Sequence, residues 1–379
     1  MKALTYNQAR YSNDNDVVSL KERVILWLVP IIGVLIVLNS ASTLAANERA
    51  AYSEPAGYGI HTPSSARWGF SYENDFLVPG SNDRDYTFGA ALSYSSRDLR
   101  STSQTADTFL TPLSVIDKLL GFKTSVWRSG VEAGLYGFTP TDVSEQQVNQ
   151  DDRPFSSLVY FSGSNERLNL EEQTVVRTQL TVGALGLSLV GKVQETVHAV
   201  IDSEQPRGWD NQISNGGELT ARYAISKQRL LPISSRHFEL RETRSISLGY
   251  LTEATWGLSF RAGNLSSSWH EFNPDTASYA ESSASVNPHK RERFFWAGAA
   301  IKARAYNTFL QGQFRDSAHT YSSSEVRHAV LELWAGYTQS FSNGYFVSYG
   351  LRAHSSEVRD GTADRNVAWG GLTLGKKVL

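Results

Sequence analysis

Apolar and polar residues alternate with a period of two over many segments of about ten residues, which is typical of β-strands that are exposed differently on their two faces. In 345–354, Tyr345, Tyr349 and Leu351 fall on one face, whereas Arg352 and His354 fall on the other. The segment 86–94 has one largely apolar face, built from Tyr86, Phe88, Ala90, Leu92 and Tyr94. Tyr and Trp recur near the ends of such faces.

Thirteen segments fit this pattern, and they predict an all-β, antiparallel fold. They are 66–76, 85–96, 126–138, 154–165, 174–188, 217–227, 236–249, 254–264, 292–303, 306–316, 326–341, 344–356 and 366–378. A bacterial single-chain transmembrane barrel has an even number of strands. We therefore predict twelve strands, which means that one of the thirteen segments is wrongly assigned. We expect that segment to be 217–227 or 236–249. A soluble β-sandwich is the alternative that alternation alone does not exclude.

The segment 191–204 departs from alternation and predicts a short amphipathic helix within a loop. Apolar residues there follow helical spacing: Val193, Val197, Val200 and Ile201. A neighbouring stripe is polar and contains Gln194, His198 and Asp202. A short helix that carries a histidine is unusual in a barrel loop, so it is a candidate for function.

Composition favours the barrel. The 379 residues include nine Trp and 11% aromatics, yet the mean hydropathy is only -0.33, as expected when half of each strand faces water. The formal net charge of -2 gives no reason to expect a nucleic-acid partner. The chain has no cysteine, which is compatible with the cell envelope without proving it.

The N-terminal region supplies a targeting signal. Val24–Leu38 is apolar, follows Lys21 and Arg23, and precedes small residues that suit signal peptidase. At about 15 residues it is short for a membrane-spanning helix, although an uncleaved anchor remains the alternative. We expect a signal peptide in 1–45, a short segment in 46–65 and an outer-membrane barrel in 66–379.

Four connections are long: 98–124, 139–152, 191–216 and 265–291. Long connections in such barrels are expected outside the cell. Counting strands places 98–124 on the opposite side, and the sequence offers no explanation for it.

Four short motifs occur in order along the chain: "ENDF" followed by "DRDYTFG", then "DRPF", then "QETVH", then "GWDNQ". Together they resemble the outer-membrane lipid A 3'-O-deacylase (LpxR-like) family, most clearly over 71–230. The resemblance implies a twelve-stranded barrel with a Ca²⁺-dependent esterase site at the extracellular rim, between the barrel wall and a loop helix. It implies lipid A of the outer leaflet as the substrate, and we expect no protein partner.

The resemblance also implies site residues. The expected catalytic group is His198, Glu204, Gln194, Thr87 and Arg153, and the expected metal ligands are Asp75 and Asn74. Their chemistry suits ester hydrolysis, because a histidine with an ordinary pKa of about 6.5 can activate water near neutrality. Glu204 or Asp202 is expected to hold its other ring nitrogen. Hard oxygen ligands suit Ca²⁺, which polarises a carbonyl, and Arg153 suits a lipid phosphate.

Other interpretations stay open for each of these residues. His198 is compatible with a surface histidine, Asp75 with a turn carboxylate, Thr87 with packing inside the barrel and Arg153 with a cation at the rim. Alternation places Asn74 and Asp75 on opposite faces unless the strand ends there. "GWDNQ" is compatible with a turn in which Trp209 anchors the chain at the membrane interface, so we leave it out of the catalytic set.

Other chemistries have weaker support. The sequence has no G-x-S-x-G motif, and its eight histidines lack the spacing of a zinc site. "HSS" at 354–356 resembles the His-x-Ser arrangement of a different lipid A deacylase, a match that arises easily by chance. Two other functions remain: a phospholipid hydrolase on the same fold, and a passive porin or structural barrel.

Overall fold

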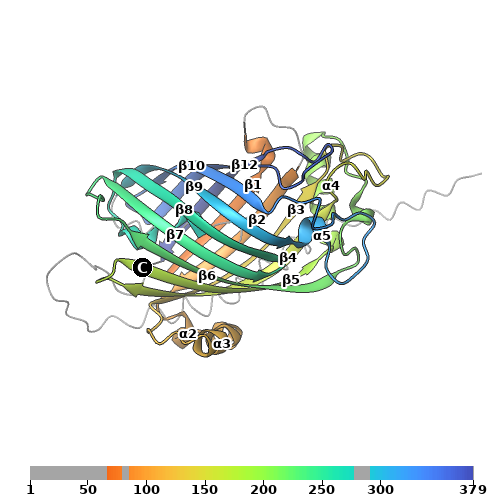
Figure 1. The fold of residues 1–379 in the computed structure, drawn as a ribbon. Helices are drawn as coiled ribbons and strands as arrows, with labels where there is room; N and C mark the ends of the chain where they lie inside the picture. The colour runs from red at the N-terminus through yellow and green to blue at the C-terminus, as the bar shows by residue number, and fades with distance from the viewer. Residues whose placement is uncertain (1–65, 79–84, 277–290, 379) are drawn as a thin grey trace, which may run out of the picture.

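The computed structural model describes residues 66–78, 85–276 and 291–378, so the predicted segments 1–45 and 46–65 lie outside it. In the described residues, twelve antiparallel strands close into one barrel in sequence order, with β1 paired to both β2 and β12 (Figure 1). The strands are β1 (Ala66–Asn74), β2 (Asp85–Ser96), β3 (Arg128–Thr139), β4 (Ser156–Asn169), β5 (Thr174–Leu185), β6 (Glu218–Leu230), β7 (Phe238–Gly249), β8 (Leu251–Asn264), β9 (Glu292–Asn307), β10 (Ala329–Ser340), β11 (Tyr345–His354) and β12 (Val367–Val378).

Short helices occupy several connections. The α-helices are α2 (Leu99–Thr102), α3 (Gln104–Leu119), α4 (Ser188–Ile201) and α5 (Thr308–Gln311). The 3-10 helices are η1 (Asp75–Leu77), η2 (Trp209–Asn211), η3 (Trp269–Glu271) and η4 (Pro274–Thr276). No helix in the described parts of the chain is long and apolar enough to cross a membrane.

The prediction of twelve strands is confirmed, but the error lay elsewhere than we expected. The segments 217–227 and 236–249 correspond to β6 and β7, whereas 306–316 forms no strand of its own: its first two residues end β9. The chain leaves β9 at Asn307, because the Asn307 side chain accepts a hydrogen bond from the Phe309 amide at 3.0 Å and caps α5. Gly312 then takes a positive φ of 71° and ends that helical turn.

The two faces of the barrel wall differ as the alternation predicts. On β10, Leu331 and Leu333 are 47% and 50% exposed, while Glu332 and Trp334 are each 4% exposed. Because the sheet is closed, the exposed apolar face is the outside of the barrel and the buried face lines its lumen.

One predicted face is wrong at a β-bulge in β2. Tyr86 pairs with Phe138 and Phe88 pairs with Gly137, so Thr87 is the extra residue. The bulge reverses the alternation at this point. Tyr86 joins an aromatic cluster with Phe138, whereas Phe88 packs in a different cluster with Trp209.

A continuous series of ion pairs fills the middle of the lumen. Glu253 lies 2.8 Å from Arg304 and 3.8 Å from Lys302, and Lys302 also pairs with Glu332. Glu332 in turn accepts a hydrogen bond from Arg352 at 2.8 Å. All five side chains are at most 8% exposed. Buried charges are tolerated when each is paired in this way.

The connection after β8 folds back into the lumen. Its Glu271, in η3, pairs with Arg67 and lies 3.1 Å from Arg128. Asp275, in η4, accepts a hydrogen bond from Ser259 at 2.8 Å. The described part of this loop therefore plugs the barrel, and residues of the wall form ion pairs and hydrogen bonds with its charged side chains.

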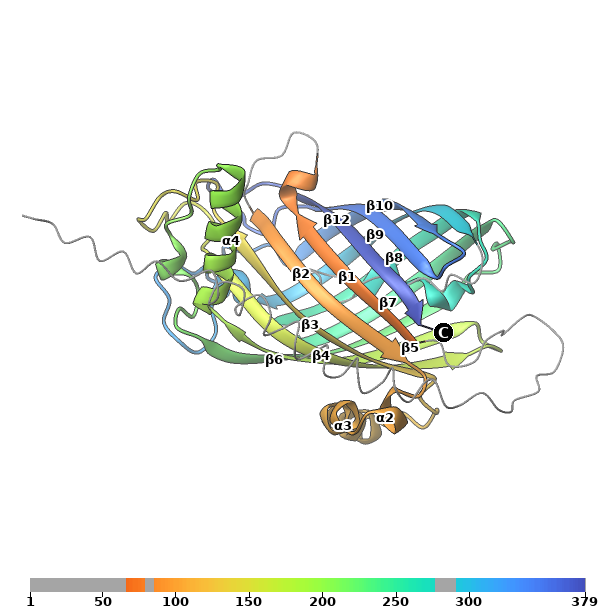
Figure 2. The ribbon, with the colours of Figure 1, turned by 180° about the vertical axis from the view of Figure 1, so that it is seen from behind.

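The barrel has two distinct rims (Figures 1 and 2). The α4 rim carries α4, α5 and the connections 140–155 and 355–366, and the terminal rim carries both ends of the barrel, at Ala66 and Val378. The connection that contains α2 and α3 leaves the terminal rim, as strand counting implied, and so does the one after β8. Figure 2 shows α4 beside β2 and β3 and places α3 outside the wall.

Candidate functional site

The helix α4 turns a partly polar stripe towards the barrel. Val190, Gln194 and His198 follow i, i+4 and i+8 spacing and are 0%, 2% and 5% exposed, whereas Val200 is 80% exposed. The predicted helix is therefore present, three residues earlier than expected. Its buried stripe is the one that carries the histidine. Asp202 ends the helix in the left-handed conformation, with its amide bonded to the His198 carbonyl.

A small apolar cluster fixes α4 to the outside of the wall. Val190 packs with Phe88 of β2, Phe155 and Trp209. Gly137 lies beneath them on β3, where an added Cβ would come within 2.9 Å of Val190 Cγ1 and 3.0 Å of the Trp209 ring. The absence of a side chain at Gly137 therefore lets the helix lie close to the barrel.

The His198 ring is oriented by the backbone that follows the helix. Its Nδ1 lies 2.5 Å from the carbonyl oxygen of Glu204. A carbonyl only accepts, so Nδ1 carries the proton and Nε2 is the basic nitrogen. Glu204 and Asp202 are both exposed. Glu204 thus orients the ring through its main chain, rather than through the carboxylate that we expected.

Gln194 lies one turn before His198 and is held by Trp209. The Trp209 Nε1–H donates to Gln194 Oε1 at 2.8 Å. An indole is a donor only, so this bond fixes which end of the amide faces it. Gln194 Nε2 then points the other way and is buried with no hydrogen-bond partner among the described residues. A buried donor left in this state costs about 1–3 kcal/mol.

Trp209 is the residue of this site that the sequence interpretation left out. It lies in η2, is 6% exposed and packs against Phe155 with ring centroids 5.0 Å apart. The alternative in which Trp209 anchors the chain at the membrane interface does not fit, because its ring is enclosed between α4 and the wall. Its place in "GWDNQ", beside other motifs of the site, was the available signal.

Thr87 occupies the bulge in β2 and is 1% exposed. Its hydroxyl is hydrogen-bonded to the hydroxyl of Thr139, the last residue of β3. The next residue, Phe88, packs in the cluster that holds α4. Thr87 therefore lies at the α4 rim, adjacent in sequence to a residue that contacts the docked helix.

Asn74 and Asp75 lie at the α4 rim, where β1 ends and η1 begins. Asp75 is 1% exposed, and Asn74 Oδ1 accepts a hydrogen bond from the Phe76 amide at 2.7 Å. The strand therefore ends two residues before the predicted limit of 66–76, and strand alternation no longer fixes the relative faces of Asn74 and Asp75. Tyr349 of β11 holds η1 in place by donating to the Leu77 carbonyl at 2.6 Å.

The donor set can be tested for Ca²⁺, which takes six to eight oxygens. Within the described residues no group of three or more His, Cys, Asp or Glu side chains is placed to hold a metal. Asp75 fits as a single anionic ligand. Asn74 Oδ1 retains one lone pair beyond its capping bond. A site built on them needs further oxygen from backbone, water or substrate.

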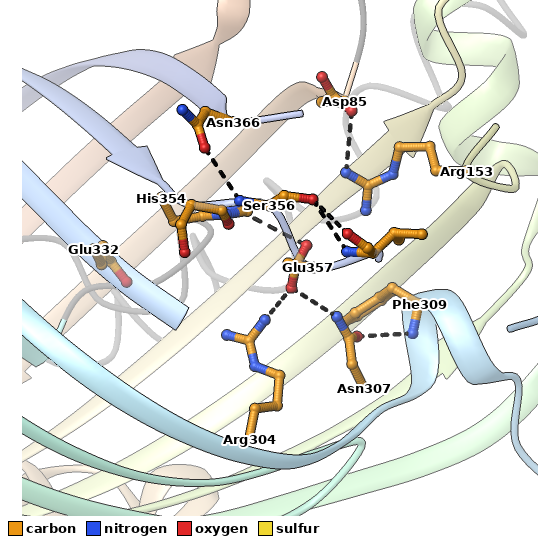
Figure 3. A network of polar contacts seen from close by, with 12 residues as sticks. Asp85, Arg153, Arg304, Asn307, Phe309, Glu332, His354, Ser356, Glu357 and Asn366 are labelled. Atoms are coloured by element: carbon orange, nitrogen blue, oxygen red, sulfur yellow. Dashed lines mark hydrogen bonds and ion pairs between the residues drawn. The ribbon is translucent and has the colours of Figure 1, made fainter. Parts of the chain in front are cut away.

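Arg153 lies on the lumen side of the rim. Its guanidinium covers the Phe138 ring at 4.5 Å, and its Nη1 is 3.5 Å from Asp85 Oδ1. Figure 3 shows it facing the network of Asp85 and Glu357. These contacts join Arg153 to the luminal network, whereas the contacts of Gln194 lie outside the wall.

The His-x-Ser alternative does not form a catalytic pair. His354 Nδ1 is 2.8 Å from the Ser355 carbonyl, and its Nε2 is 3.8 Å from Glu357. The Ser356 hydroxyl donates to the Val358 carbonyl at 2.8 Å. Both residues belong to the luminal network in Figure 3.

A closed twelve-stranded barrel with an apolar outer face, a packed polar lumen and a helix docked outside its wall defines an integral β-barrel protein of the bacterial outer membrane. This chain belongs to the LpxR family: the family described as outer membrane protein LpxR matches residues 31–378. It is thus a member of an outer-membrane lipid A deacylase family, and the resemblance seen in its motifs is confirmed.

Solved structures agree with the fold. LpxR from Salmonella typhimurium has a TM-score of 0.64 at 17% identity, covering 82% of this chain and 99% of that chain. The KdgM porin gives a TM-score of 0.36 at 5% identity, covering 83% and 99%. An outer membrane channel from Pseudomonas putida F1 gives 0.41 at 7% identity, covering 86% and 100%. The last two scores are too low to support an argument. No curated protein matches the sequence.

Proposed function

We propose that this protein hydrolyses the ester that links the acyl chain to the 3' position of lipid A, with His198 as the general base and Ca²⁺ as the cofactor. The observation that carries the proposal is the buried pair on α4. His198 is held in one tautomer by the Glu204 carbonyl, and Gln194 presents a buried amide donor one turn away.

The pair supplies the two functions that ester hydrolysis needs. His198 Nε2 takes a proton from water as the water oxygen attacks the ester carbonyl carbon. Gln194 Nε2 donates to the oxygen that becomes negative in the tetrahedral intermediate. The intermediate then breaks its bond to the sugar oxygen, which receives the proton from His198, and the products are a carboxylic acid and a sugar hydroxyl. No serine nucleophile takes part.

Ca²⁺, when bound, would polarise the ester carbonyl as a Lewis acid. Asp75 is the residue that we propose to hold it, with Asn74 as a second oxygen donor. Thr87 supports the same part of the rim through its bond to Thr139. For Arg153 we propose electrostatic support of the rim through Asp85, since its guanidinium faces the lumen.

The position of α4 suits a substrate that arrives from the membrane. The helix packs outside the barrel over β3 and β4, so its buried stripe is next to the lipid-facing surface and separate from the lumen. The α4 rim would then face the outer leaflet. Exposed Val200 gives the helix an apolar contact for an acyl chain.

The decisive measurement is mass spectrometry of lipid A from cells that express the protein. The wild-type chain should remove the 3' acyl group, and it should do so only when Ca²⁺ is present. His198→Ala should leave lipid A intact, whereas His237→Ala, at an exposed histidine of the terminal rim, should behave as wild type. Unchanged lipid A with the wild-type chain would refute the proposal. Loss of acyl chains from glycerophospholipids instead would identify the phospholipid hydrolase.

A further inference from the structure

The helix α3 lies against the outside of the barrel, where a barrel of this kind normally contacts lipid. Leu110, Leu113 and Ala106 are buried in a cluster with outward-facing Tyr94 and Val131 of the wall. Gly163 of β4 makes this close contact possible, because an added Cβ there would come within 2.8 Å of Leu110 Cδ2. The helix thus packs against the outer faces of β2, β3 and β4, and both views place it outside the wall (Figures 1 and 2).

A buried carboxylate fixes the far end of α3 to the wall. Asp117 is 2% exposed and accepts hydrogen bonds from Arg167 at 2.6 Å, Thr178 at 2.9 Å and Tyr223 at 2.9 Å. Asn165 donates to the same carboxylate at 3.0 Å. These partners come from β4, β5 and β6, so the helix is firmly held and its orientation is defined.

The opposite face of α3 is left uncovered by the residues that the structure describes, and the exposed side chains of its C-terminal half are mainly apolar. Val115 is 51% exposed, Leu119 is 81% exposed and Leu120 is 56% exposed. Nearer its N-terminus, the Thr108 hydroxyl donates to the Gln104 carbonyl at 2.9 Å, and the Thr111 hydroxyl to the Asp107 carbonyl at 2.8 Å. Hydroxyls satisfied by the preceding turn are compatible with an apolar environment.

This face continues the lipid-facing surface of the barrel. Along one row of the wall, outward-facing Tyr345 pairs with Lys376, Lys376 with Trp68, and Trp68 with Tyr94. Lys376 also covers the Tyr345 ring at 4.7 Å. Aromatic and basic residues of this kind mark the membrane interface. Trp68 and Tyr94 belong to the cluster that α3 covers.

We infer that α3 is a membrane-contact element, whose Val115, Leu119 and Leu120 lie among the acyl chains of glycerophospholipids in the leaflet at the terminal rim. Exposed Lys118 and Lys123 flank this apolar end and suit the lipid phosphates. The inference gives a role to the connection 98–124. It depends on the barrel lying in a membrane, not on the proposed esterase activity.

Because the chain has no cysteine, single cysteines report on this contact directly. We would place the full barrel, labelled with an environment-sensitive fluorophore at Leu119→Cys, in phosphatidylcholine vesicles whose acyl chains are brominated. Ile301→Cys, on the outer wall of β9 and 57% exposed, is the lipid-facing control. Gln147→Cys, in an exposed loop at the α4 rim, is the aqueous control. Val115→Cys provides a second probe on α3.

The labels on α3 should show blue-shifted emission and a loss of fluorescence in brominated vesicles, close to the loss at Ile301. Quenching at both α3 positions no greater than at Gln147 would overturn the inference. The vesicles contain no lipid A, so the outcome is independent of the esterase proposal.

Discussion

The hydrogen bond between Trp209 and Gln194 allows the proposed chemistry to be tested apart from the fold. Gln194→Met removes both the amide donor and the acceptor of the Trp209 bond, while keeping a side chain of similar length. Trp209→Phe removes only the bond that orients the amide and keeps a ring against Phe155. The two variants therefore separate donation to the substrate from orientation of the donor.

The expected magnitudes differ between stability and rate. Trp209→Phe leaves Gln194 Oε1 without its partner, so it should lose about 1–3 kcal/mol of unfolding free energy. Gln194→Met leaves the Trp209 N–H unpaired but also removes the unsatisfied Nε2, so its net change in unfolding free energy should be smaller. Loss of one donor to a developing oxyanion lowers kcat by about 10²–10³, which we expect for Gln194→Met. Trp209→Phe should lower kcat about tenfold. This corresponds to roughly 1.4 kcal/mol of activation free energy, lost because the amide is less well positioned.

The assay is the initial rate of fatty-acid release from purified lipid A at saturating Ca²⁺. The unfolding transition, followed by the electrophoretic mobility of the folded barrel, serves as the control. If Gln194→Met were as active as wild type, Gln194 would not donate to the transition state. Equal losses of rate in both variants would mean that Gln194 only supports the helix.

Four further outcomes follow from the same structure. Gly137→Leu should abolish activity while the barrel still folds, because the new side chain would displace α4; lipid A mass spectrometry beside a mobility assay checks both. Glu332→Ala should lower the unfolding free energy by about 3–5 kcal/mol, since Arg352 loses its carboxylate partner and Lys302 keeps only Glu253, 3.8 Å away; adding Arg352→Ala should restore part of the lost stability. Planar bilayers with the wild-type protein should show no open channel, and steady conductance would favour the porin. Burial lowers the pKa of His319, so folding loses stability as the pH falls below about 6.5; His319→Gln should flatten that profile in pH-dependent unfolding.

The sign of the His319 effect follows from proton uptake. The neutral form of the His319 imidazole is favoured in the folded protein. The ring is only 7% exposed there, and its Nε2 lies 3.1 Å from the Asp152 carbonyl oxygen. The unfolded chain keeps an ordinary imidazole and binds more protons as the pH falls. If His319→Gln left the pH dependence of the unfolding free energy unchanged, another titrating group would be responsible for it.

The order of residue types was enough to predict the class of fold and most of the strands. Alternation is a local property, because adjacent side chains of a strand point to opposite faces whatever else the chain does. It therefore located β10 and β11 and identified the outward face of β11 correctly. Helical spacing likewise revealed α4, and the ordered motifs revealed the family.

Features that depend on contacts between distant segments could be seen only in the folded barrel. The bulge at Thr87 reverses the alternation because β3 pairs with β2 on both sides of it, which the sequence of β2 does not encode by itself. Which stripe of α4 is buried depends on the gap that Gly137 leaves on the wall. The tautomer of His198 depends on a carbonyl beyond the helix, and the side of the rim that Arg153 faces depends on Asp85 and Phe138. In each case the sequence contains the residue type, but the residue's contacts depend on how distant segments pack together.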